Sequence, residues 1–126
     1  MKQGHFVAIS FDPVSYTCLL FDSLALEANF AFVDPNISNV LEYLKQEHTT
    51  LKCIQMKRAI QSLTSSMCGF HCVAFVLSRD SRLKQNFQKF LSAYNTEEKK
   101  LKTNDLISVN YILQFIEQFG VNKISK

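Results

Sequence analysis

The feature that most constrains this chain is residues 61–77, QSLTSSMCGFHCVAFVL, where a polar loop becomes a strongly apolar segment at a cysteine. Four apolar residues in it follow the i, i+3, i+4, i+7 spacing of one helix face: Phe70, Val73, Ala74 and Leu77. The other faces of the same helix are also largely apolar. The pattern therefore predicts a helix that begins near Cys68 and is buried on most sides.

A thiol at the start of such a helix is well placed for chemistry. The first turn of a helix leaves backbone N–H groups unpaired, and together with the positive end of the helix dipole they stabilise a thiolate. The thiolate is the nucleophilic form of cysteine. Gly69, which follows Cys68, has no Cβ and lets backbone or substrate approach closely. Cys68 is therefore the candidate nucleophile.

Candidates for the other parts of such a site lie far from Cys68 in the sequence. His5 begins one run with β-propensity and Asp22 ends a second, and the turn-like residues 12–15 join the two runs. An antiparallel hairpin would bring the start of the first strand beside the end of the second, which makes His5 a candidate base and Asp22 its orienting acid. The side-chain amide of Gln61 and the backbone N–H of Cys68 are candidate donors to an oxyanion.

The order His5, Asp22, Gln61, Cys68, within GHFVAISFDPVSYTCLLFDSL and QSLTSSMCGFHC, resembles the adenovirus-type cysteine protease family (adenain). The resemblance extends over most of the chain, to a final amphipathic helix. It implies an adenain-like, papain-like architecture with catalytic His5, Asp22 and Cys68, and an oxyanion hole formed by Gln61 and Cys68. Phe6 stands where the family usually has tryptophan, and Asp22 where it usually has glutamate. Only residues 1–4 precede His5, so we expect one protease domain, 1–126, that lacks the family's N-terminal segment.

The resemblance also implies a function and partners. The implied function is that of a cysteine endopeptidase, which cleaves viral or virus-like-element precursor proteins at Gly-containing sites during maturation. The reaction would proceed through a thioester intermediate. No essential cofactor is expected. An activating peptide and nonspecific DNA are the accessory partners that the resemblance allows, with Cys53 as the residue that would form a disulfide with the peptide. Packing in a buried strand explains Cys53 equally well.

Composition sets the outer bounds. At 126 residues the chain is expected to form one domain, and 47% hydrophobic with 20% charged residues is typical of a globular protein. The net charge of +3 is compatible with weak DNA affinity but does not establish it. Four scattered cysteines indicate reduced thiols, and no signal peptide or membrane-length apolar run is present. We therefore expect a virion, host nuclear or host cytoplasmic location, without secretion or membrane contact.

The remaining segments predict a small mixed or antiparallel sheet packed with helices, an α+β fold. Residues 35–47 have the apolar stripe of a helix, and residues 51–56 alternate as a strand that leads to Gln61. A further helix is expected from a cap at Ser81 through Tyr94. A last one is expected after a cap at Thr103 or Asn104, ending at Gly120. Residues 23–34 combine strand and helix signals and are left unassigned.

Three alternatives remain open. A ubiquitin-like-protein-specific protease shares the order of the four site residues, but that group usually has aspartate before the cysteine, where this chain has Met67. A degenerate protease domain used only for binding is a second alternative. The third is a zinc-stabilised interaction module, whose candidate ligands are Cys53, Cys68, His71 and Cys72.

Overall fold

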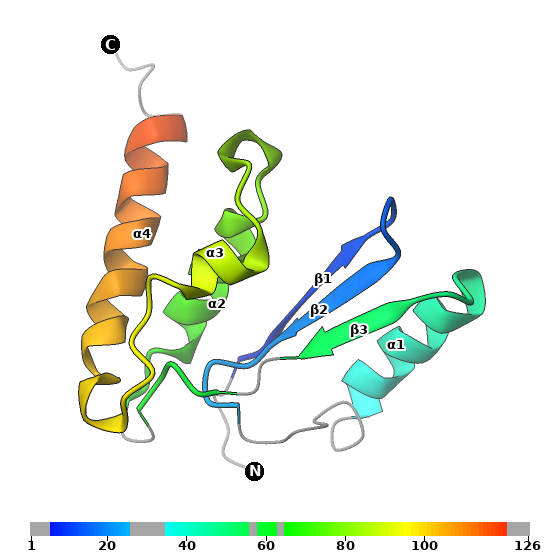
Figure 1. The fold of residues 1–126 in the computed structure, drawn as a ribbon, viewed down its shortest axis with the longest axis horizontal. Helices are drawn as coiled ribbons and strands as arrows, with labels where there is room; N and C mark the ends of the chain where they lie inside the picture. The colour runs from blue at the N-terminus through cyan, green and yellow to red at the C-terminus, as the bar shows by residue number, and fades with distance from the viewer. Residues whose placement is uncertain (1–5, 26–34, 56–57, 63–64, 121–126) are drawn as a thin grey trace.

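The computed structural model of the chain describes residues 6–25, 35–55, 58–62 and 65–120. In Figure 1, helix α1 (Pro35–Glu47) and helix α2 (Cys68–Ser78) lie on either side of a small sheet, and helix α4 (Thr103–Phe119) lies beside α2. Helices packed against a small sheet confirm the predicted α+β fold.

The sheet has three strands in the order β1 (Ala8–Asp12), β2 (Thr17–Phe21) and β3 (Lys52–Gln55). Strands β1 and β2 are antiparallel, whereas β2 and β3 are parallel and are connected through α1. A parallel pair needs such a crossover, because the chain must return to the same end of the sheet. The sheet is therefore mixed, as the sequence indicated.

The β1–β2 turn is held by one aspartate. Asp12 accepts the backbone N–H of Val14 on Oδ1 at 2.9 Å and the hydroxyl of Ser15 on Oδ2 at 3.0 Å. This is the use of aspartate expected in a tight turn. The resulting register pairs Ala8 with Phe21, so the start of β1 lies beside the end of β2. The predicted antiparallel hairpin is confirmed.

Strand β2 is central, and its side chains alternate between two apolar clusters. On one face, Cys18 and Leu20 pack against Leu41 of α1. On the other face, Leu19 and Phe21 pack in a larger cluster with residues of α2, Phe75 among them, and of helix α3 (Phe87–Leu91). A strand that is covered on both faces has a nearly continuous apolar sequence, as β2 has in TCLLF. This strand ends at Phe21, so it delivers Asp22 to the edge of the larger cluster.

Helix α2 begins at Cys68, as predicted, but its buried face differs from the predicted stripe. The buried residues are Cys68, His71, Cys72, Ala74, Phe75 and Ser78. Phe70 and Val73 of the predicted stripe are about half exposed, and so is Val76. The prediction ranked residues by hydrophobicity, whereas His71 and Ser78 are buried because each has hydrogen-bond partners inside the protein.

The helix predicted from Ser81 through Tyr94 is interrupted. The structure has a short 3₁₀ turn, η2 (Ser81–Leu83), and then helix α3 (Phe87–Leu91). The caps are Asp80, which accepts the Arg82 N–H, and Asn86, which accepts the Lys89 N–H. Lys84 between them has a positive φ of 51°, which ends the first turn. Two side-chain caps in close succession therefore divide what the apolar spacing indicated as one helix.

Helix α4 starts one or two positions earlier than predicted, and neither Thr103 nor Asn104 caps it. Its N-cap is Lys102, with no side-chain cap. Asn104 is instead fully buried and donates to the carbonyls of Ile60 and Asn95, both at 2.8 Å. Gly120 follows the helix, as predicted, but with φ of −71° rather than the left-handed conformation. Searched over the described residues, the helices include none that is both long and apolar enough to cross a membrane.

Candidate active site

The predicted nucleophile is the first residue of α2, and only 4% of its surface is exposed. Its Sγ accepts the backbone N–H of Phe6 at 3.2 Å. A Cβ added to Gly69 would lie 3.5 Å from Cδ2 of the Phe6 ring, so the segment before β1 passes directly over the start of α2. The Cys68 sulfur therefore lies at the N-terminus of α2, in contact with the backbone of the residue that follows His5.

The same peptide segment is also bound one helical turn further on. The Cys72 thiol donates to the Phe6 carbonyl oxygen at 3.3 Å. Burial, then the neighbouring Cys68 and Asp22, raise the pKa of the Cys72 thiol to about 12. Cys72 therefore stays protonated and acts as a donor, while Cys68 acts as an acceptor toward the same residue. Cys72 belongs to the larger apolar cluster, and its contact with Phe6 was not foreseen.

His5, the predicted base, lies outside the described residues. Its position relative to the Cys68 sulfur therefore stays a prediction. Phe6, the next residue in the chain, is described and makes the contacts with Cys68 and Cys72 given above.

Asp22 follows the last residue of β2 and is 3% exposed. Its Oδ1 accepts the Leu24 N–H at 3.0 Å, which fixes one side of the carboxylate. Its effect on the pKa of Cys72 places it near the Cys68–Cys72 face of α2. The structure thus brings Asp22 to the same region as Cys68, and its role toward His5 stays a prediction.

Gln61 is buried, and its side chain bridges two segments. Its Oε1 accepts the hydroxyl of Ser23, and its Nε2 donates to the Ser65 carbonyl at 3.0 Å. Its backbone N–H also donates to the carbonyl of Ser23 at 3.1 Å. The amide is therefore fixed between the residue after Asp22 and the loop before Cys68. A primary amide has two N–H donors, so the contact with Ser65 is compatible with the predicted oxyanion role.

A buried polar cluster between α2 and α4 was missed in the sequence. His71, with no exposed surface, contacts Asp105 Oδ1 through Nε2 at 2.9 Å and Ser108 Oγ through Nδ1 at 2.7 Å. The Tyr94 hydroxyl lies 2.7 Å from the same Ser108 oxygen. Burial lowers the pKa of His71, although the hydrogen bond and charge of Asp105 act in the opposite direction. The sequence signal was polar residues at i and i+4 of α4, Asn104 and Ser108, on what proves to be its buried side.

These contacts do not support the zinc-stabilised module. Both ring nitrogens of His71 have hydrogen-bond partners, and Cys53 lies in β3, opposite Cys18 in the β2–β3 register. In the described parts of the chain, no group of three or more His, Cys, Asp or Glu residues is arranged to hold a metal ion.

Cys53 is exposed, which corrects the alternative that it packs in a buried strand. Burial, with a smaller effect of the neighbouring Cys53, raises the pKa of Cys18 to about 11. All four cysteines are free thiols. An exposed thiol on a strand at the sheet's edge is compatible with the predicted disulfide to an activating peptide, which stays a prediction.

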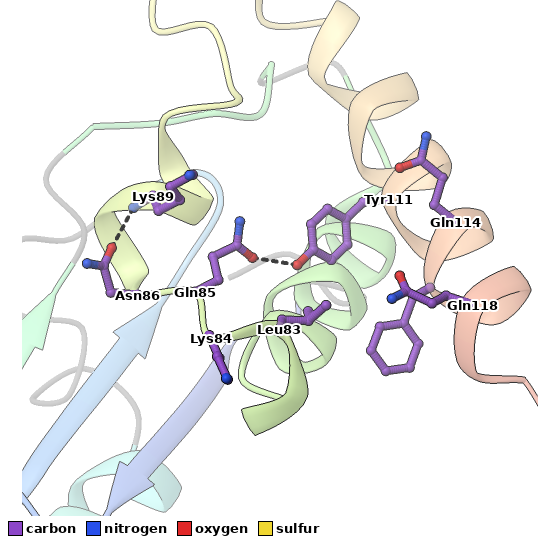
Figure 2. A pocket seen from close by; sticks show the side chains of 9 residues that line it. Leu83, Lys84, Gln85, Asn86, Lys89, Tyr111, Gln114 and Gln118 are labelled. Atoms are coloured by element: carbon purple, nitrogen blue, oxygen red, sulfur yellow. Dashed lines mark hydrogen bonds between the residues drawn. The ribbon is translucent and has the colours of Figure 1, made fainter.

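Two surface hollows differ in their relation to the site. One of about 340 Å³ lies between residues 83–89 and α4, with Tyr111 donating to Gln85 Oε1 at 2.7 Å (Figure 2), and none of the predicted site residues lines it. The other, of about 620 Å³, is lined by Gln61 together with Leu24, Arg58 and Leu101. Of these two, only the second adjoins a predicted catalytic element.

Comparison with known proteins gives one family. A family model described as adenovirus endoprotease matches residues 2–108. A search of curated proteins found no match. The matched region includes His5, Asp22, Gln61 and Cys68, and it covers the sheet, α2 and the first six residues of α4. The chain therefore belongs to the adenovirus endoprotease family.

Proposed function

We propose that this protein is a cysteine endopeptidase whose nucleophile is Cys68. The observation that carries the proposal is the position of buried Cys68 at the start of helix α2, with its sulfur accepting the N–H of the residue that follows His5. Asp22 and Gln61 reach the same region from β2 and from the loop before α2. Membership of an endoprotease family supports a protease activity in general.

The proposed reaction is acyl transfer in two stages. His5 takes the Cys68 proton, Asp22 orients the imidazole, and the thiolate attacks the peptide carbonyl carbon. The Cys68 N–H and the Gln61 amide stabilise the resulting oxyanion. When the C–N bond breaks, the amine leaves with the proton from His5 and an acyl thioester remains on Cys68. Water, activated by His5, then hydrolyses the thioester and restores the thiol.

The proposed substrates are precursor polypeptides of a virus or a virus-like mobile element, cut at Gly-containing sites during maturation. An activating peptide at Cys53 and nonspecific DNA are proposed accessory partners. A virion or the host nucleus or cytoplasm is the proposed location. The exposed position of Cys53 on the edge strand supports the proposal of a peptide partner. The net charge of +3 has the sign that favours DNA binding.

The test compares wild-type and Cys68→Ala protein on Gly-rich precursor-like peptides, with and without DNA. Cleavage by the wild type should fall by at least about 10⁴-fold in the variant. A Ser92→Ala variant serves as the control, because it changes an exposed side chain without touching Cys68 or any proposed partner site. If the wild type is as inert as Cys68→Ala under every condition, the protein is a binding module and the proposal is wrong.

A second measurement follows the thiol itself. In a Cys53→Ser background, iodoacetamide near pH 7 should label Cys68 before Cys18 and Cys72, whose pKa values are raised to about 11 and 12. His5→Ala should slow the labelling of Cys68. Equal labelling of Cys68 with and without His5 would argue against an imidazole acting on this sulfur.

A further inference from the structure

Ser65, in the loop that precedes Cys68, is hydrogen-bonded to helix α4. Its hydroxyl donates to Asp105 Oδ2 at 2.9 Å and accepts the Met67 N–H at 3.1 Å. Its carbonyl accepts the Gln61 side-chain N–H at 3.0 Å. Ser65 therefore contacts the side chain on one flank of the proposed oxyanion hole and the residue immediately before Cys68 on the other.

Asp105 is itself fixed from the opposite side. Its Oδ1 contacts His71 Nε2, so the two carboxylate oxygens have different partners. A carboxylate only accepts, so Nε2 carries a proton, and neutral His71 then accepts the Ser108 hydroxyl on Nδ1. The Tyr94 hydroxyl donates to Ser108. In this series of hydrogen bonds from Asp105 to Tyr94, each donor has one acceptor, so the direction of one bond determines the direction of the next.

We propose that Ser65 and Asp105 are positioning residues for the oxyanion hole: Asp105, anchored by His71, holds Ser65, and Ser65 sets the Gln61 amide and the start of α2. The proposal rests on the proposed function, because it assigns these residues to the same reaction. A displacement of about 1 Å at a catalytic group can cost about 100-fold in rate. The two residues touch neither the substrate nor the sulfur in this scheme.

Their surroundings separate this role from general stability. Neither belongs to the two apolar clusters that pack the sheet against α1 and α2. Ser65 and Asp105 are both only partly buried. Loss of the Ser65 hydroxyl should therefore shift the loop while leaving the clusters intact.

The experiment uses Ser65→Ala, the conservative Ser65→Thr, and the control Ser92→Ala, all in the full chain. Cys53 is kept for the cleavage assay, and the exposed Cys53 is replaced by serine only for the alkylation assay. Ser92 is exposed and donates to the Lys89 carbonyl in α3. Two rates are measured: peptide cleavage, as kcat and KM, and alkylation of Cys68 by iodoacetamide. Alkylation displaces iodide from carbon and forms no oxyanion, so it reports the thiolate alone.

Ser65→Ala should lower kcat about 10- to 100-fold, with KM and the alkylation rate within about twofold of the parent. Ser65→Thr should recover most of kcat, and Ser92→Ala should match the parent. If the parent cleaves the peptide and Ser65→Ala cleaves it equally well, this inference is wrong and the proposed function still stands. Equal losses of kcat and alkylation also overturn it, because the defect is then structural. A parent that does not cleave overturns the proposed function and this inference with it.

Asp105→Asn keeps the test decisive if Ser65→Ala does not fold, as judged by its thermal melt. The amide keeps the shape of the side chain but must donate where aspartate accepts, so it cannot accept from both Ser65 and His71. Its kcat should fall with unchanged alkylation. An unchanged kcat in Asp105→Asn overturns the inference.

Discussion

Helix α2 is held by apolar contacts on the side that faces the sheet and by polar contacts on the side that faces α4. Toward the sheet, Phe75 stacks on Phe21 with ring centroids 4.7 Å apart and planes within 5°, and Phe90 meets both rings edge-on. Toward α4, His71 contacts Asp105 and Ser108 in a polar cluster. Apolar contacts are non-directional and tolerate swaps that conserve volume, whereas each polar contact requires a particular atom in a particular place. The sheet side therefore holds the helix in the fold, and the α4 side fixes how the helix and its preceding loop are oriented.

The largest expected effect on stability comes from the sheet side. Phe75→Ala removes a fully buried ring from the cluster and should lower the free energy of unfolding by about 3–5 kcal/mol. Urea denaturation followed by circular dichroism measures it. Phe75→Leu, which conserves most of the volume, should cost clearly less. A loss below about 1 kcal/mol for Phe75→Ala would break the comparison, because the stacked rings would then not anchor the helix.

The polar side should contribute less, and for a different reason. Ser108→Ala leaves His71 Nδ1 and the Tyr94 hydroxyl without their shared partner, and such unsatisfied buried groups cost about 1–3 kcal/mol. The same denaturation assay applies, with exposed Ser92→Ala as the control. An unchanged stability would mean that the cluster can rearrange, which contradicts the directional character assigned to it.

A smaller and gradual effect should appear with pH. Burial lowers the pKa of His71 in the folded protein, so the unfolded chain, with an ordinary pKa of about 6.5, binds the proton first. The stability that neutral His71 contributes is therefore complete above about pH 6.5 and is lost as the pH falls through the lowered folded value.

The measurement is the unfolding free energy of wild type and His71→Gln between pH 7.5 and 5. The advantage of the wild type should shrink toward pH 5, because glutamine does not titrate. The Asp105 carboxylate faces the same ring and opposes the shift, so a widening gap would show that its charge outweighs burial.

The smallest effect on the free energy of unfolding is expected on the side of α2 that faces neither the sheet nor α4. Val76 is 55% exposed, and Val76→Ala should change the unfolding free energy by no more than about 0.5 kcal/mol. Thermal melts suffice to measure it. A larger loss would show that this third side is covered, and the comparison of two sides would need to include it.

The sequence predicted the elements near the site well because local signals agreed there. The Asp12 turn, the apolar TCLLF strand and the start of α2 at Cys68 each depend on neighbouring residues, and all three were confirmed. The family resemblance was confirmed too, over residues 2–108. The roles of His5, Asp22, Gln61 and Cys68 stay predictions.

The sequence predictions that were wrong concerned residues whose contacts lie in distant segments of the chain. The buried side of α2 could not be predicted from hydrophobicity, because His71 is paired by Asp105 and Ser108 from a helix some 35 residues further along. Asn104 likewise reads as a helix cap in its local sequence but binds the carbonyls of Ile60 and Asn95. In each case a polar residue is buried because its partners come from elsewhere in the chain, and its neighbours in the sequence do not identify those partners.

The two-sulfur attachment of Phe6 has a practical consequence for anyone who handles this protein. A tag or dye fused at the amino end would join the chain within five residues of Phe6, whose backbone N–H contacts the Cys68 sulfur. The far end of α4, where Phe119 lies beneath the Arg82 guanidinium, is remote from that thiol (Figure 1). Fusions for purification or detection therefore belong at the carboxyl end.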